Sequence, residues 1–356
     1  MGNSRWRLEM ALNYVAKNAH ELGREDDVEV LVADWGSEIP LREVLQLSPA
    51  AAKIVSFVLI PGEIARVLQK DSPFPEVLAL NAAARRVMGQ YIGRIDQDTL
   101  VGKRFLTMFF KMHDGDEQLA TALDTVLLFA NRRCIPYRFA VRCPSFWVVD
   151  RFIRLFGPSL KIETSRPPVP FYLADVGIWL LHRNLWNECG GYDERMIYMN
   201  AMEPDMISRL IEKCKMVDLG KLVNYDFYHL EHYHPRGVRK SSSYRKTNRE
   251  FCTQPNIFYP NSKDWGLIQY PLEVLPYGGK VETGACEQAR AELARFLLLM
   301  VSAGAQFTWD SLILSLRAAH SHWTRRAGTA WDAIRGQPLV RWPSILRGLW
   351  SQRTVR

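Results

Sequence analysis

The pattern of hydrophobic and polar positions in the first hundred residues alternates between helical and extended periods. Residues 5–22 carry apolar side chains near a 3.6-residue period, which predicts an amphipathic helix. Runs rich in β-branched residues predict strands over 28–34, 53–60 and 90–95, and an Ala- and Arg-rich helix is expected over 79–88. This alternation predicts an α/β fold in which helices cover a mostly parallel sheet.

The pattern continues with elements of both kinds as far as residue 226. We expect helices over 105–112, 118–131 and 146–156, a short strand over 137–141, and a Pro-rich connector over 158–170. Beyond the connector we expect a strand over 175–182, a helical turn over 183–189, a loop over 190–194, a helix over 203–213, and short strands over 216–219 and 222–226.

The composition is that of an ordinary globular protein. Of 356 residues, 47% are hydrophobic and 24% are charged, which excludes a mainly disordered, collagenous or coiled-coil chain. The six Cys form no C-x-x-C pair, so we expect reduced thiols rather than a zinc knuckle or a disulfide scaffold. The chain has no run of 18 apolar residues and does not open on an apolar leader, so we expect a cytoplasmic protein.

Positive charge gathers at the end of the chain. There are 46 Lys and Arg against 38 Asp and Glu, and residues 308–356 hold eight Arg but only two Asp. The same segment carries five of the eleven Trp, a combination typical of contact with an anionic membrane surface. The alternative is a solvated helical appendage. Because no nucleic-acid-binding motif accompanies the Arg, we expect no nucleic-acid partner.

Carboxylates follow two of the predicted strands. Asp96 and Asp98, separated by Gln97, come directly after the third strand and can hold a hard divalent cation that bridges a diphosphate. The alternative is a turn in which they cap the run that begins at Thr99. Asp34 follows the first strand, where its carboxylate can accept from a base or ribose, or can simply cap a turn.

Two later clusters can contribute to the same chemistry. The loop 190–194 has the sequence Gly-Gly-Tyr-Asp-Glu, and its glycines permit close backbone approach. Glu203 and Asp205 begin a predicted helix, where a carboxylate can act as a general base on a sugar hydroxyl or merely complement the helix dipole.

Three of the eight His stand close together, at positions 229, 232 and 234. An imidazole there can complete the coordination of a Mn²⁺-type ion that carboxylates already hold. The alternative is that all three are surface or core histidines beside the neighbouring tyrosines. The sequence leaves open which of them binds a metal.

The order and spacing of these motifs resemble a family 2 glycosyltransferase of the GT-A fold, over roughly residues 5–240. The middle part resembles a galactosyltransferase-type C-terminal module. Such proteins have a Rossmann-like, mostly parallel sheet flanked by helices, and here a helical basic extension follows. The motifs are Asp34, Leu80 to Arg85, Asp96 to Asp98, Asp175 to Arg183, Gly190 to Glu194, Glu203 to Leu210 and His229 to Arg236.

The resemblance implies a role for each motif. On the donor side, Asp96 and Asp98 match the D-x-D that binds Mn²⁺ or Mg²⁺ and the diphosphate, while Asp34 and Asn81 match positions that hold the nucleotide. His232 or His234 matches a late histidine on the metal or diphosphate. On the acceptor side, Glu203 matches the catalytic base with Asp205 as its competitor, and Gly190, Gly191, Tyr192 and Asp193 match the acceptor-binding loop.

The implied reaction is a single in-line displacement, with inversion, from a nucleotide sugar to a hydroxyl of a glycan or lipid-linked acceptor. Family habit favours UDP as the nucleotide. We expect a transferase domain over 1–255, with a nucleotide-sugar half up to about residue 100, a linker and helix over 256–307, and the tail over 308–356.

Two features depart from the family pattern. Family members open with an apolar strand ahead of the first helix, whereas this sequence opens on the helix itself. The acidic pair expected before the later helix is Met202-Glu203 here. The alternative function is therefore a catalytically silent glycosyltransferase-like protein that binds a glycan or a partner at a membrane surface.

Overall fold

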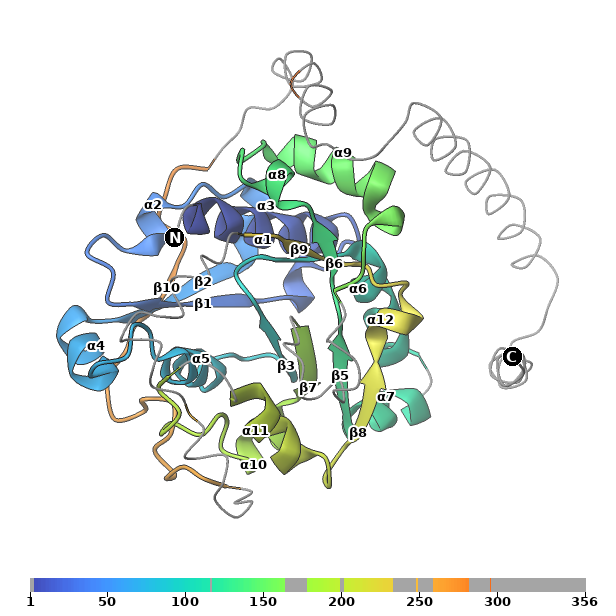
Figure 1. The fold of residues 1–356 in the computed structure, drawn as a ribbon. Helices are drawn as coiled ribbons and strands as arrows, with labels where there is room; N and C mark the ends of the chain where they lie inside the picture. The colour runs from blue at the N-terminus through green and yellow to red at the C-terminus, as the bar shows by residue number, and fades with distance from the viewer. Residues whose placement is uncertain are drawn as a thin grey trace. The chain divides into compact units, whose positions relative to one another are not determined.

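The computed structural model describes residues 3–115, 117–163, 178–198, 202–232, 248, 259–281 and 295. The chain divides into two compact units, Met1–Ala303 and Gly304–Arg356, and all described residues belong to the first. The predicted basic tail therefore lies outside the described residues. Within them the fold is mixed α/β, with helices on both sides of the sheets (Figure 1).

The first sheet contains the two strands that lead to Asp34 and Pro61. β1 (Val30–Trp35) pairs in parallel with β2 (Val55–Ile60), and β10 (Val274–Pro276) adds to β2 in the antiparallel direction. Because β2 is buried on both faces, its apolar residues alternate between two clusters. Phe57 faces α1 (Ser4–His20) and α3 (Pro49–Ile54), while Val58 packs with Ala65 and Ala82 of α4 (Gly62–Gln69) and α5 (Glu76–Ala84).

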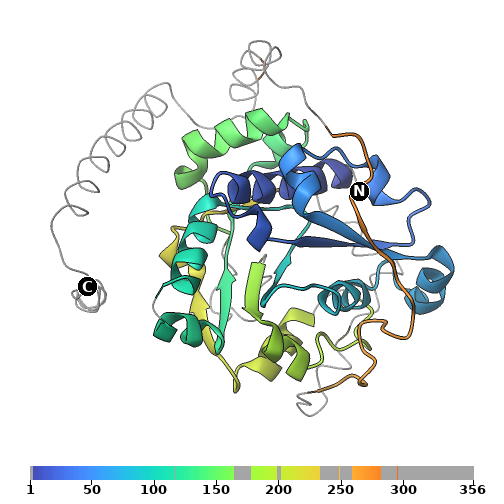
Figure 2. The same ribbon diagram turned by 180° about the vertical axis from the view of Figure 1, so that it is seen from behind.

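The second sheet forms the centre of the unit. Its order is β3 (Tyr91–Ile95), β7 (Ile178–His182), β5 (Val126–Ala130), β8 (Lys215–Asp218), and β7 runs antiparallel to both neighbours. One face packs on α5, α10 (Arg183–Glu188) and α11 (Met202–Leu210). The other packs on α1, α6 (Lys103–His113), α7 (Glu117–Leu123) and α12 (Leu219–Leu222), so the sheet lies between helices (Figure 2).

The third sheet is small but carries most of the site. β9 (Phe227–Leu230) lies between β4 (Thr99–Val101), antiparallel, and β6 (Arg133–Ile135), parallel. The register sets His229 opposite Thr99 on one side and opposite Cys134 on the other. Since directly paired residues point to the same face of a sheet, the neighbourhood of His229 is fixed by backbone hydrogen bonds.

Short helices complete the described chain: η1 (Glu25–Asp27), α2 (Leu41–Val44), α8 (Tyr137–Ala140), α9 (Phe146–Phe156) and η2 (Gly157–Ser159). Among the described helices, none combines the length and the hydrophobicity that a bilayer-crossing segment needs. The described cysteines 134, 143, 189 and 214 are free thiols, as the spacing predicts.

Most of the predicted elements are confirmed, with bounds shifted by a few residues. The helices over 5–22 and 146–156 are α1 and α9, and the strands over 28–34, 53–60 and 90–95 are β1, β2 and β3. The predicted elements over 79–88, 175–182, 183–189, 203–213 and 216–219 are α5, β7, α10, α11 and β8.

Three predictions of secondary structure are wrong. The helix expected over 118–131 ends at Leu123 and gives way to β5, because residues 126–130 are apolar throughout and are buried on both faces of the sheet. The strand expected over 137–141 is the helix α8, since the strand β6 ends just before Pro136. The strand expected over 222–226 is replaced by α12 and a turn, and pairing begins at Phe227.

The expectation of a mostly parallel sheet is also wrong. The described strands make three parallel and four antiparallel pairings. The physical reason is the direction of β7, which enters the second sheet between β3 and β5 and opposes both. Strand direction is a property of the connections between elements, which hydrophobic periodicity does not record.

The closeness of β4 to β9 depends on Gly102. A Cβ at this position would lie 2.2 Å from the backbone oxygen of Asp226, and the Gly102 N–H donates to that oxygen at 2.8 Å. We expect Gly102→Ala to lower the free energy of unfolding by about 1–3 kcal/mol, because the two backbones must separate. Urea unfolding followed by circular dichroism measures the change.

Gly62 provides the matched control for this substitution. It begins α4, has an ordinary negative φ, and a Cβ there would meet only the flexible end of Arg66 at 3.4 Å. Gly62→Ala should leave stability unchanged or raise it slightly. Equal losses in the two variants would show that the contact between Gly102 and Asp226 has no special part in the fold.

Candidate functional site

Asp98 meets two imidazoles at the end of β9. It directly precedes β4, and its carbonyl accepts the Leu230 N–H at 2.9 Å, which continues the ladder between the two strands. Its side-chain Oδ2 lies 3.0 Å from Nε2 of His232 and 3.6 Å from Nε2 of His229. One donor atom from each of the three residues lies within 4.8 Å of the other two. The structure thus joins one predicted aspartate to the histidine cluster.

The electrostatics of this group favour charged forms. Burial raises the pKa of Asp98, but hydrogen bonds from His229 and His232 and the charge of Arg132 outweigh it and hold that pKa far below its usual range. Burial lowers the pKa of His229, yet contacts with Asp98, Cys134 and Glu163 raise it to about 11. His229 is therefore an imidazolium held between two carboxylates, and a metal ion would replace its proton.

Asp96 is neutralised by two arginines rather than by the histidines. Its Oδ1 lies 2.8 Å from Arg94 Nη2, and its Oδ2 lies 3.0 Å from Arg132 Nη1. The same Arg132 nitrogen is 3.3 Å from Asp98 Oδ1 and donates to Thr99 Oγ1 at 2.7 Å. Arg132 thus bridges the two aspartates of the D-x-D motif, and Asp96 is outside the group of three possible ligands.

Glu203 joins this network through Arg94. Arg94 lies in β3, and its Nη1 is 2.6 Å from Glu203 Oε1 at the start of α11. Its Nη2 contacts both Asp96 and Glu76 Oε1, each at 2.8 Å. Burial lowers the pKa of Arg94, but the surrounding carboxylates raise it well above its usual value. The predicted base and the predicted diphosphate site therefore lie on either side of one guanidinium group.

Asp205, the competing base, has a different environment. Its carboxylate accepts from Arg209 Nε at 3.0 Å, one helical turn away, and burial raises its pKa. The other nitrogens of Arg209 donate to the backbone oxygens of Cys189 at 3.0 Å and Gly191 at 2.9 Å. Asp205 therefore orients an arginine that supports the Gly-Gly loop, whereas Glu203 belongs to the D-x-D network.

Asp34 is buried at the end of β1, and only one of its two carboxylate oxygens has a hydrogen-bond partner among the described residues. Its Oδ2 accepts the Leu41 N–H at 2.7 Å, which caps the chain ahead of α2. Its Oδ1 is buried and has no hydrogen-bond partner among the described residues. A buried acceptor of this kind is costly without a donor, and the described residues supply none to this oxygen.

Asn81 and the loop 190–194 are tied together inside the protein. The Asn81 amide accepts from the Tyr192 N–H at 2.9 Å and donates to the Tyr192 carbonyl at 2.9 Å, and the residue is fully buried. Tyr192 is equally buried between Trp179 and Trp186, with ring centroids 5.6 and 5.7 Å away. The two groups predicted to touch donor and acceptor are therefore bonded to each other.

The remaining predicted acceptor residues shape this loop. Gly190 and Gly191 have φ values of +68° and +70°, and a Cβ at Gly191 would lie 2.4 Å from Asn81 Oδ1. Asp193 is buried and paired with Arg195 at 2.6 Å. These four residues build a rigid turn, and their contact with an acceptor stays a prediction.

The three-residue group fits a divalent cation. Two ligands about 2.1 Å from a metal lie about 3 Å apart at a right angle and about 3.6 Å apart at an angle near 120°, so the 3.0 and 3.6 Å separations around Asp98 are compatible with a shared ion. Two imidazoles and a carboxylate suit Mn²⁺ and related ions. Asp96 could join only if Arg132 moved. His234 lies outside the described residues, so its predicted role stays a prediction.

Sequence reasoning missed the partners that surround these carboxylates. Arg94, Arg132, Glu76 and Glu163 stand in no recognisable motif. Arg94 and Arg132 contact Asp96, Glu163 lies beside His229, and Glu76 pairs with Arg94. One available signal was Arg94 itself, a charged residue in a short strand directly before D-x-D. His229 was among the three candidate histidines and is the one whose position the β9 register fixes.

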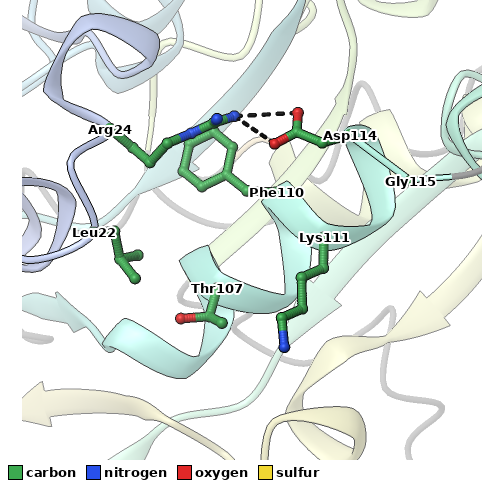
Figure 3. Close-up of a pocket in the computed structure, with 7 residues that line it drawn as sticks. All are labelled: Leu22, Arg24, Thr107, Phe110, Lys111, Asp114 and Gly115. Carbon is green, nitrogen blue, oxygen red and sulfur yellow. Dashed lines mark hydrogen bonds and ion pairs between the residues drawn. The ribbon is translucent and has the colours of Figure 1, made fainter. Parts of the chain in front are cut away.

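One hollow of about 360 Å³ in the described structure lies elsewhere (Figure 3). It is lined by Leu22 and Arg24 after α1 and by residues of α6 and the turn after it. In it Arg24 lies over the Phe110 ring, 4.1 Å from its centroid, and pairs with Asp114 at 2.9 Å. None of the site residues described above lines this hollow, so the hollow is separate from the candidate site.

The crowding of carboxylates around Arg94 predicts a pH-dependent stability. Burial raises the pKa of Glu76 to about 7; Arg94 opposes this, and the charges of Glu203 and Asp96 add to it. Since the unfolded carboxyl ionises near pH 4.3, the stabilisation from protonated Glu76 is complete below that pH and is lost as the pH rises toward 7. Glu76→Gln should therefore gain stability relative to wild type, by about 1–3 kcal/mol, between pH 4.5 and 7.5.

Chemical denaturation at several pH values measures this difference. Glu63→Gln is the matched control, since Glu63 is exposed but also stands in the first turn of a helix. It should show no relative change over the same range. A parallel pH profile for wild type and Glu76→Gln would contradict the raised pKa of this half-buried carboxyl.

Neither family models nor curated protein sequences give a match to this chain. The proposed function therefore rests on the geometry of the site and on the sequence motifs. That geometry is a metal-compatible group of Asp98, His229 and His232, joined through Arg132, Asp96 and Arg94 to Glu203.

Proposed function

We propose that the protein is a metal-dependent inverting glycosyltransferase of the GT-A type. It would move a sugar from a nucleotide sugar, UDP-linked by family habit, to a hydroxyl of a glycan or lipid-linked acceptor. The observation that carries the proposal is the single network from Asp98 through Arg132, Asp96 and Arg94 to Glu203. Residues 96 and 203 are far apart in the chain, and transfer chemistry requires them together.

On the donor side, Asp98, His229 and His232 would hold Mn²⁺ or Mg²⁺. When bound, the ion neutralises charge on the departing nucleoside diphosphate. Arg94 and Arg132, which pair with Asp96 and Asp98, would add fixed positive charge near the diphosphate. Guanidinium groups bind phosphate with paired hydrogen bonds. The available Oδ1 of Asp34 supports nucleotide binding, because a base or ribose donor would satisfy it.

On the acceptor side, Glu203 would accept the proton of the attacking hydroxyl. Its pairing with Arg94 at 2.6 Å orients the carboxylate, which a general base requires. An attack in line with the departing diphosphate inverts the anomeric centre. Asp205 is paired with Arg209 and would orient the Gly-Gly loop instead.

The place of action is proposed from the sequence. The Trp- and Arg-rich segment 308–356 suits the headgroup region of an anionic membrane. Contact with the cytoplasmic face would concentrate the enzyme near a lipid-linked acceptor.

One observation favours the silent, glycan- or partner-binding alternative. Asp96 already has two guanidinium partners, and Arg132 also reaches Asp98, so protein cations occupy the positions that a metal would neutralise. If Arg132 stays paired with Asp96 and Asp98 when a metal is present, the network is a charge cluster with a purely structural role. The alternative therefore differs from the first proposal in one measurable property, which is metal-dependent turnover.

The test measures release of nucleoside diphosphate from a panel of nucleotide sugars, with Mn²⁺ and with chelator. We expect Mn²⁺-dependent turnover in wild type and a loss of about 100-fold or more in Asp98→Asn. Glu203→Gln should lower kcat by about 10²–10⁴-fold with little change in Mn²⁺ affinity, because it removes a base but no ligand.

Asp114→Asn is the matched control, since Asp114 is half-exposed and pairs with Arg24 at the remote hollow. It should keep full turnover. Turnover that survives both Asp98→Asn and Glu203→Gln would overturn the proposed mechanism. Binding of nucleotide and Mn²⁺ without turnover of any donor would favour the silent alternative.

A further inference from the structure

A second group of possible ligands lies on the other side of His229. Cys134 Sγ, a Glu163 carboxylate oxygen and a His229 ring nitrogen all lie within 4.8 Å of one another. The proposed transfer reaction uses neither Cys134 nor Glu163. The site inferred below therefore does not rest on that reaction, whereas its competition with Mn²⁺ rests on the metal group of the proposed function.

The backbone fixes all three residues of this group. Cys134 in β6 is in register with His229 in β9. Glu163 is tied to the same strand, because its N–H donates to the Arg132 carbonyl at 2.7 Å and the preceding Ile162 pairs with Arg133. The cluster is therefore a built feature of the third sheet rather than a meeting of long surface side chains.

One atom of this group, His229 Nδ1, is buried without an ordinary hydrogen-bond partner among the described residues. His229 Nδ1 is buried and lies 3.4 Å from Glu163 Oε1, which is beyond the usual length of an N–H···O bond. The other Glu163 oxygen accepts from Arg132 Nε at 3.0 Å, which orients the carboxylate. Cys134 is a free, partly buried thiol. A thiol, an imidazole nitrogen and a carboxylate oxygen thus converge on one point.

We propose that Cys134, Glu163 and His229 form a site for a soft divalent cation of the zinc class. Thiolate, imidazole and carboxylate are the ligands that Zn²⁺ takes in proteins, and three of them leave a fourth position for water. Glu163 is about one-third exposed, so solvent reaches that position. The thiolate distinguishes this site from the Asp98 group, whose oxygen and imidazole donors suit Mn²⁺.

His229 also has the surroundings expected of a zinc ligand. A histidine that binds a metal through one nitrogen commonly donates its other N–H to a carboxylate, which orients the ring. With a metal on Nδ1, the Nε2–H of His229 would face Asp98 Oδ2, which lies 3.6 Å away and would form a hydrogen bond after a small approach. Asp98 would then serve as the orienting carboxylate of the soft site.

The shared imidazole makes the two sites compete. A neutral imidazole offers one lone pair, so His229 can bind a metal at Nδ1 or at Nε2 but not at both. Zinc at the Cys134 site would therefore remove His229 from the Asp98 group and leave it with Asp98 and His232. By linkage, each metal should weaken the binding of the other by the same factor.

The first experiment titrates Co²⁺ into the metal-free, reduced full-length protein. Co²⁺ stands in for Zn²⁺ and gives a near-ultraviolet charge-transfer band when a thiolate coordinates it. We expect the band in wild type and in Cys143→Ser, a control at another partly buried thiol. It should be lost in Cys134→Ser and should form about tenfold or more weakly in Glu163→Gln.

The second experiment measures Mn²⁺ binding by electron paramagnetic resonance with and without one equivalent of Zn²⁺. Zinc should weaken Mn²⁺ binding about tenfold or more in wild type and should have no effect in Cys134→Ser. Circular dichroism checks that the variants are folded, and Glu163→Gln provides the second test if Cys134→Ser is not.

The outcomes separate this proposal from the transferase. Absence of the cobalt band, or its persistence in Cys134→Ser, would overturn the soft-metal site whether or not sugar is transferred. Unchanged Mn²⁺ binding in the presence of zinc would overturn the competition. A protein that transfers no sugar but loses its cobalt band in Cys134→Ser would retain the soft site and lose only the proposed function.

Discussion

The structure depends on the balance of charge around two buried arginines. Arg94 contacts Glu76, Asp96 and Glu203, and Arg132 contacts Asp96, Asp98 and Glu163. Five carboxylates could not be gathered in so little solvent without these cations, because an unpaired buried charge costs several kcal/mol. The ion pairs of the two arginines with these carboxylates therefore connect the second sheet, the third sheet and α11.

The same balance has a chemical consequence. A carboxylate cluster neutralised by its own arginines is stable without an added cation, and it can still exchange one positive partner for another. Of these five carboxylates, Asp98 has two imidazoles as well as a guanidinium group beside it, which makes it the carboxylate best placed to share a metal with histidines. The Asp98 group, which has imidazole nitrogens beside it, is thus separate from Glu203, whose carboxylate is paired with Arg94.

β9 gives this arrangement its geometry. It is the middle strand of a small sheet, and its one histidine lies opposite Cys134 on one side and opposite Thr99, the residue after Asp98, on the other. One ring therefore connects an oxygen-rich group to a sulfur-containing group. The register thus places one nitrogen of His229 near Asp98 and the other near Glu163, so a change at one nitrogen affects the other.

The sequence by itself determined the local elements and the residues at their ends. Apolar periodicity located α1, β1, β2, β3 and α9, and the positions of Asp34 and the D-x-D motif follow from where those strands stop. It was least successful at β5, where an apolar run buried on both faces has no period to distinguish strand from helix. Hydrophobic periodicity also did not predict that β7 runs antiparallel to its neighbours.

The tertiary structure alone decided which charged groups meet. Arg94 and Glu203 are more than a hundred residues apart, and no spacing rule connects them. Asn81 is a second contact that spacing does not predict, since its side-chain amide is buried and hydrogen-bonded to the Tyr192 backbone. The reason is physical: periodicity reports how one element buries its own face, whereas partners across a site are fixed by strand order, register and the need to pair every buried charge.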